Sequence, residues 1–389
     1  MKVTGVITEY NPFHNGHKYH IEEARRITDA DYIVAVMSPD YVQRGVPAMI
    51  DKHARAKMAL AAGVDLVLEL PVGYATGSAE YFAAGAVNIL DALGIIRYCC
   101  FGSEHGTLDY FLEIAKILLE EPPYYQDALK MYLKKGDSFP VARKKALCAK
   151  PKSKWEDFLA SPNNILGLEY CKKLLQLQST IKPITIQRIE NDYHDEELSA
   201  RVSSATAIRR KLEDTTDILA IKQHLPKSAF RVLAETLDRT GILNEDDFSL
   251  LLKYKLMCET PESLTNYMDV SESLANRISN HLNEFRSFSQ FADLLKTREL
   301  TRTRINRALL HILLNIHQPD PITHIRILGF QESAAPLLSA IKAGSKLPLI
   351  TKVNEKIYDP FAANLYESTA SMKYDRGFVH EFSKTIIKY

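Results

Sequence analysis

The sequence of 389 residues contains no apolar run that approaches the ~20 residues needed for a membrane-spanning helix. Its five cysteines show no C-x-x-C spacing, and no signal peptide is recognisable at the start of the chain. Reduced thiols in a cytoplasmic protein are therefore expected. A length of 389 residues predicts two or three domains. The chain also lacks internal repeats and low-complexity linkers, so its two halves are expected to pack closely.

The chain has almost no net charge, since 49 lysines and arginines stand against 48 acidic residues and leave only +1. A nucleic-acid partner would have to be held by local basic patches rather than by the charge of the whole molecule. Each patch, taken alone, is more often the solvated face of a helix. The candidate patches are Lys134 with Lys135, residues 143–154, residues 209–211, and Arg302 with Arg304 and Arg307.

The first half of the chain alternates continuous apolar runs with helical patterns. Strands are predicted at 3–10, 31–38, 64–71, 96–104 and 181–189, and helices at 18–28, 52–63, 79–94, 161–177 and 203–213. Continuous rather than alternating apolar runs are typical of strands buried on both faces of a parallel sheet. The sequence therefore predicts a doubly wound, Rossmann-like α/β domain over residues 1–212, with a Lys-rich helical insert at about 120–155.

The second half contains helical patterns almost exclusively. A mainly α-helical domain is therefore predicted over residues 213–389. Its last part, "IRILGFQESAAPLLSAIK" followed by "LPLITKV", has the pattern of a short strand, a helix and another strand.

The stretch "TEYNPFHNGHKYH", residues 8–20, places His14 and His17 around Asn15 and Gly16, directly after the first strand. In a doubly wound sheet, ligands bind at the carboxyl ends of the strands. A helix that starts near Gly16 or His17 directs free backbone N–H groups at an anion, and Gly16 allows the anion to approach closely. Two imidazoles can donate hydrogen bonds to phosphate and stabilise charge that develops on a transferred phosphorus.

Other interpretations of these histidines are open. The spacing His-x-x-His also occurs in zinc sites, although no cysteine or carboxylate stands nearby at a familiar ligand spacing. A purely structural role is the third interpretation. The P-loop pattern G-x-x-x-x-G-K-[ST] is absent. A phosphate site is favoured, and no metal-ligating residues are predicted.

The arrangement of strand, "HNGH" and helix resembles the H-x-G-H signature of the nucleotidyltransferase superfamily, in which the motif binds ATP phosphates. The block "VSSATAIRRKL", residues 202–212, resembles the I-S-S-T-x-x-R block of the same superfamily, where a hydroxyl and a basic residue hold these phosphates. Ala205 before Thr206 departs from that block. It is therefore open whether Ser203, Ser204 or Thr206 contacts phosphate.

Further stretches, among them "GVITEYNPFHNGHKYHI", "VAVMSPDYVQRGVPAMIDKHARAKMAL", "SPNNILGLEY" and "TRTRINRALLHIL", resemble the bacterial tRNA(Met) cytidine acetate ligase family over most of the chain. This resemblance implies two steps. Acetate and ATP give acetyl-adenylate and pyrophosphate, and N4 of the wobble cytidine of elongator tRNA(Met) then takes the acetyl group and releases AMP. Magnesium is expected to accompany ATP. The general base of the second step is not evident, and the AMP phosphate is one candidate.

The resemblance also implies residue roles. His14 and His17 are predicted to be catalytic. The predicted ATP site comprises Ile7, Thr8, Glu9, Asn11, His14, Gly16, His17, His20, Gly102, Asn163, Asn164, Arg188, Ser204 and Thr206. The predicted tRNA-binding residues are Lys144, Lys145, Arg302, Arg304 and Arg307. For Gln43, Arg44, Gly45, Lys52, Arg55 and Lys57, a contact to triphosphate or tRNA and an ordinary surface position remain equally open.

Two other functions use the same residues. A small-molecule adenylyltransferase acting on pantetheine phosphate or nicotinate mononucleotide needs the same histidines, but it does not need a large helical domain with basic rows. A non-catalytic tRNA-binding protein needs the basic rows, but it does not need an intact His14, Gly16 and His17.

Overall fold

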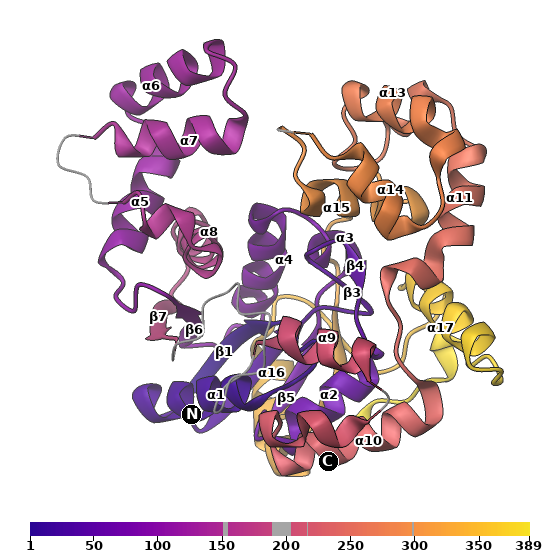
Figure 1. Cartoon of the computed structure of the whole chain (residues 1–389). Coiled ribbons are helices and arrows are strands. Elements are labelled where there is room, and N and C mark those ends of the chain that lie inside the picture. Colours follow the sequence, from indigo (N-terminus) through magenta and orange to yellow (C-terminus); the bar gives the residue numbers. More distant parts are fainter. Residues whose placement is uncertain (151–154, 189–203, 216, 298) are drawn as a thin grey trace.

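The computed structural model describes residues 1–150, 155–188, 204–215, 217–297 and 299–389, and an eight-stranded sheet forms its centre (Figure 1). The strand order is β10-β8-β5-β2-β1-β6-β7, and β9 pairs with β8. The chain runs from β1 to β2 and β5 on one side and then returns to β6 and β7 on the other. These five strands are parallel, which confirms the predicted doubly wound fold. They are β1 (Val3–Thr8), β2 (Tyr32–Met37), β5 (Leu66–Glu69), β6 (Tyr98–Ser103) and β7 (Lys182–Gln187).

Helices cover both faces of the sheet, which explains why its strands are continuously apolar. Val34 and Val36 of β2 pack with the core beneath α4 (Ala79–Ala92), α5 (Asp109–Glu120) and α8 (Pro162–Gln176). Ile33 and Ala35 of the same strand pack with α1 (Asn15–Thr28), α2 (Lys52–Ala61) and α10 (Lys227–Thr240) on the opposite face. Successive side chains of a strand point to opposite faces, so each strand contributes to both cores.

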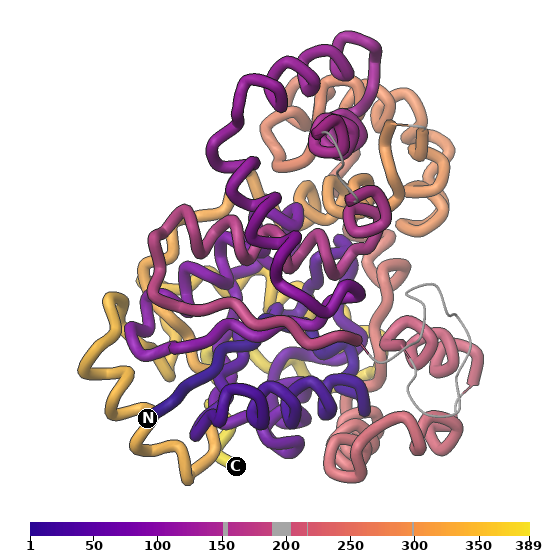
Figure 2. The backbone as a smooth tube through the Cα atoms, turned by 90° about the vertical axis from the view of Figure 1, so that its left-hand side faces the viewer, coloured from indigo at the N-terminus to yellow at the C-terminus, as the bar shows by residue number. Residues whose placement is uncertain are grey.

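Two helical parts stand at the same end of the molecule, and the two chain termini lie at the other end (Figures 1 and 2). The first part is the pair α6 (Pro123–Lys134) and α7 (Phe139–Cys148), which lies between β6 and β7 in the chain. The second has its own apolar core and comprises α11 (Ser249–Met257), α12 (Pro261–Leu264), α13 (Glu272–His281), α14 (Phe288–Leu295) and α15 (Arg302–Leu313). Among the described residues, no helix is both long and apolar enough to span a membrane.

The last part of the chain returns to the sheet. β8 (Ile325–Phe330), α16 (Ala335–Gly344) and β9 (Leu349–Ile350) form the predicted strand, helix and strand, and β10 (Ile387–Lys388) pairs with β8 beyond the helix α17 (Phe361–Lys373). β8 comes from beyond residue 212 and pairs with β5 in antiparallel orientation, so the sheet is not confined to residues 1–212. The division of the chain at residue 212 remains a prediction.

A buried cluster of charges fastens this last part of the chain to the sheet. Lys52 Nζ lies 2.8 Å from both Glu69 Oε1 and Glu381 Oε1. The Arg326 guanidinium lies 2.8 Å from Glu69 and 2.7 Å from Glu381. Burial alone would lower the pKa of Lys52, but Glu69 and the groups around it hold that pKa well above its ordinary value. Lys52 is therefore fully buried, and it is not among the residues that line the cavity described below.

Candidate active site

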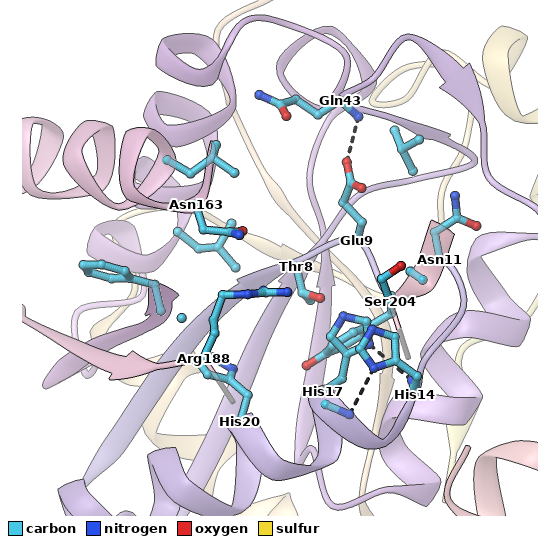
Figure 3. Close-up of a pocket in the computed structure, with 18 of the residues that line it drawn as sticks. Thr8, Glu9, Asn11, His14, His17, His20, Gln43, Asn163, Arg188 and Ser204 are labelled. Atoms are coloured by element: carbon cyan, nitrogen blue, oxygen red, sulfur yellow. Dashed lines mark hydrogen bonds between the residues drawn. The ribbon is translucent and has the colours of Figure 1, made fainter. Parts of the chain in front are cut away.

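A cavity of about 290 Å³ lies at the carboxyl ends of β1, β6 and β7 (Figure 3). Its walls also include the first turns of α1, the hairpin of β3 (Tyr41–Val42) and β4 (Val46–Pro47), and the starts of α8 and α9 (Ala205–Asp214). Of the residues predicted to bind ATP, all except Asn164 line it. They are Ile7, Thr8, Glu9, Asn11, His14, Gly16, His17, His20, Gly102, Asn163, Arg188, Ser204 and Thr206.

His14 and His17 form the N-terminal cap of α1. His14 is the N-cap residue, and its Nδ1 accepts a hydrogen bond from the Gly16 N–H at 3.0 Å. His17 Nδ1 accepts in return from the His14 N–H at 3.3 Å, and the two rings stack with centroids 3.7 Å apart. Because both Nδ1 atoms are acceptors, each neutral ring carries its hydrogen on Nε2. The pair therefore offers two Nε2–H donors at the start of a helix.

These imidazoles are neutral at physiological pH. Burial, together with the positive charges of Arg188 and Arg209, lowers the pKa of His14 to about 3. Burial also brings the pKa of His17 well below its ordinary value and that of His20 to about 4. A neutral ring can still donate from Nε2, while the positive charge at the cavity comes from its arginines.

Two arginines meet at the start of α9. Ser204 is the N-cap residue, and its Oγ accepts from the Ala207 N–H at 3.1 Å. Thr206 Oγ1 accepts from Arg209 at 3.3 Å and from Arg44 at 3.5 Å. Burial lowers the pKa of Arg209, and the charge of Arg44 adds to this effect. Two guanidinium groups beside free N–H groups form a site that favours an anion.

Arg209 is the main cavity residue that the sequence interpretation did not single out. The sequence places it in the basic patch 209–211. Its NH1 also donates to the Asn11 carbonyl oxygen at 2.6 Å, which ties α9 to the loop after β1. The T-x-x-R spacing from Thr206 to Arg209 was the signal that could have identified it. Ser203, the third hydroxyl candidate, lies outside the described residues.

Only one of the two adjacent asparagines reaches the cavity. Asn163 lines it and donates from Nδ2 to Glu104 Oε1 at 2.5 Å. Asn164 is 2% exposed, and its Oδ1 accepts from the backbone N–H groups of Glu104 and His105. Asn164 therefore holds the loop after β6 and does not face the cavity. Gly102 also lines the cavity, and a Cβ added to it would lie 3.5 Å from the Arg188 side chain.

The segment after β2 divides between cavity and core. Gln43 and Arg44 line the cavity. Gly45 instead packs closely on α15: its φ is +75°, and an added Cβ would lie 2.3 Å from the backbone nitrogen of Arg307. Arg55 is fully buried. Lys57 forms an exposed ion pair with Glu235 at 3.1 Å.

The predicted tRNA-binding residues lie outside the cavity. Arg302 pairs with Asp293, Arg307 pairs with Asp269 at 2.8 Å, and Lys145 pairs with Asp137 at 2.8 Å. To bind phosphate, these three side chains would have to leave their carboxylate partners or contact the phosphate and the carboxylate together. Arg304 and Lys144 are partly exposed. In the part of the chain that the structure describes, no group of three or more His, Cys, Asp or Glu side chains is arranged to hold a metal ion.

Known proteins resemble this chain over nearly its whole length. The HIGH Nucleotidyl Transferase family profile matches residues 1–381. The tRNA(Met) cytidine acetate ligase of Acetivibrio thermocellus is 43% identical over 376 residues, which are 92% of this chain and 89% of that protein. The protein of the same name from Clostridium novyi is 39% identical, with 97% of this chain and 98% of the relative covered.

Solved structures agree with this result. Thermotoga maritima TmcAL in complex with alpha-thio ATP superimposes with a TM-score of 0.90 and 34% identity, covering 100% of this chain and 99% of the other. The apo form of the same protein gives a TM-score of 0.93. The chain therefore belongs to the HIGH nucleotidyl transferases and, within them, to the tRNA(Met) cytidine acetate ligase family.

Proposed function

We propose that this protein uses ATP to activate acetate and transfers the acetyl group to N4 of the wobble cytidine of elongator tRNA(Met). The observation that carries the proposal is the stacked His14–His17 pair, which caps a helix at the carboxyl end of β1 in a chain 43% identical to a named tRNA(Met) cytidine acetate ligase. A conjugated cytosine amine is a poor nucleophile, and free acetate has no good leaving group. Adenylation of acetate supplies that leaving group.

In the first step, acetate attacks the α-phosphorus of ATP and pyrophosphate leaves. The Nε2–H groups of His14 and His17 donate to the phosphate oxygens as negative charge develops there. The N-terminus of α9 and the pair Arg44–Arg209 bind the departing pyrophosphate. Because Nδ1 of each neutral ring already accepts a backbone N–H, Nε2 keeps its hydrogen and can donate it. Magnesium accompanies ATP as its counterion in this proposal.

In the second step, the cytidine of the tRNA reaches the acetyl-adenylate, and AMP leaves. The tRNA is held in this proposal by basic side chains of the helical parts, Arg304 on α15 and Lys144 on α7. Both helical parts stand at the same end of the molecule (Figure 1), as a long RNA partner requires. RNA contacts of this kind are made mainly to phosphates.

The experiment that tests this function is an incubation of the pure protein with ATP, acetate and bulk tRNA, followed by mass analysis of the nucleosides. N4-acetylcytidine is expected only when acetate and ATP are both present. A small-molecule adenylyltransferase would instead release pyrophosphate with pantetheine phosphate or nicotinate mononucleotide and would leave the tRNA unmodified. That result would refute the proposal.

A further inference from the structure

Glu9 is the only carboxylate among the described residues that line the cavity, and two bonds hold it in place. Its Oε1 accepts from the Gln43 N–H at 2.8 Å. Its backbone oxygen accepts from Arg55 NH1 at 2.7 Å. The same buried guanidinium also donates to the carbonyl oxygens of Ile50 and Ser38. A charged side chain fixed in this way is preorganised to bind a ligand.

The second oxygen of Glu9, Oε2, has no hydrogen-bond partner among the described residues. Arg209, whose pKa is lowered by burial and partly restored by the charge of Glu9, bonds to Asn11 and Thr206 instead. Figure 3 shows Glu9 directed toward Gln43, on the side of the cavity away from His20. Glu9 thus presents an acceptor to the cavity, apart from the donors at the start of α1.

A fixed carboxylate is poorly suited to the anionic groups of the substrates. The triphosphate and acetate are both anions and would be repelled by Glu9. The N4 amine of cytosine, in contrast, is a hydrogen-bond donor, and glutamate is a side chain that accepts from it. Val42 and Val46 of the hairpin line the same cavity as Glu9, and their apolar side chains suit the face of a flat base.

We propose that Glu9 binds the N4 amine of the target cytosine and removes its proton during acetyl transfer. This inference rests on the proposed function. The N4 lone pair attacks the carbonyl carbon of acetyl-adenylate, the new C–N bond forms, and the C–O bond to AMP breaks. Glu9 Oε2 takes the N4 proton and later releases it to solvent. The same oxygen disfavours uracil, because uracil presents its O4 acceptor at that position.

The test separates the two steps in the Glu9→Gln variant. Glutamine has the same shape, and its amide oxygen can still accept from Gln43, but it cannot take a proton. Acetate-dependent exchange of pyrophosphate into ATP without tRNA is expected to stay within about threefold of wild type. Single-turnover acetyl transfer to tRNA is expected to fall about a hundred-fold or more. Glu235→Gln, a surface substitution outside the cavity, is the matched control and should leave both rates unchanged.

Binding supplies a second readout. A tRNA transcript with uridine in place of the target cytidine should compete weakly for the wild-type protein. It should compete about as well as the cytidine transcript for Glu9→Gln, whose amide can donate to O4. Equal losses of exchange and transfer would overturn the inference, because Glu9 would then serve ATP. Unchanged transfer would also overturn it. Wild-type protein without acetate-dependent exchange would instead refute the proposed function.

Discussion

The role of His14 leads to a prediction with two separable parts. The residue caps α1 through Nδ1 and, in the proposed mechanism, donates to phosphate through Nε2–H. Alanine removes both groups. Asparagine removes only the Nε2–H donor, because its side-chain oxygen can accept from the Gly16 N–H and asparagine is among the best N-cap residues. His14→Ala and His14→Asn should therefore differ in stability and agree in activity.

The magnitudes follow from the two bonds. Loss of an N-cap acceptor costs about 1 kcal/mol of unfolding free energy, and this loss is expected for His14→Ala only. Loss of one preorganised donor to a developing anion lowers kcat about a hundred-fold or more, and this loss is expected for both variants. The reciprocal bond from the His14 N–H to His17 is a backbone donation, so it remains available in both.

Urea unfolding measures the first part, and acetate-dependent pyrophosphate exchange measures the second. If His14→Asn kept wild-type exchange, the Nε2–H group would have no role at the phosphate, and His14 would be only a helix cap. If both variants lost the same stability, the cap geometry would be irrelevant to folding. Either result would refute the reasoning from the paired imidazoles.

Three further predictions concern other parts of the molecule. Lys52→Met removes a positive charge beside the buried carboxylates of Glu69 and Glu381, so it should lower the free energy of unfolding, measured in urea, by about 3–5 kcal/mol. Lys57→Met on the same helix removes only an exposed ion pair and should lower that free energy by less than about 1 kcal/mol. His14, His17 and His20 have lowered pKa values in the folded protein. Their contribution to stability is therefore complete above about pH 6.5, the pKa of histidine in the unfolded chain. It is lost as the pH falls toward the folded-state pKa values, because the unfolded chain then binds more protons than the folded protein. Between pH 7.5 and 5.5 this loss should reach no more than about 4 kcal/mol, and His20→Gln should reduce it; an unchanged loss would contradict the assignment. Arg304→Gln should raise KM for tRNA several-fold and leave KM for ATP unchanged, whereas a parallel loss of ATP affinity would contradict a role in tRNA binding.

Most of the cavity could be predicted because its residues follow strands. Gly102 is the next-to-last residue of β6, Arg188 follows β7, and His14 follows β1. Carboxyl ends of parallel strands meet at one edge of a sheet, so the position of each residue along the chain already implied that they meet. A helix start near Gly16 or His17 was predicted, and α1 begins at Asn15, because a helix start depends on residues within one turn of each other.

The sequence by itself therefore determined the doubly wound sheet and the histidines at its first helix, because periodicity and capping are local properties of the chain. Only the tertiary structure decided that Lys52 is buried rather than exposed, since its partner Glu381 comes from the far end of the chain. It also decided that Asn163 rather than Asn164 reaches the cavity, and that Gln43 holds Glu9. Such outcomes depend on which distant segments pack together, and a pattern of neighbouring residues does not contain that information.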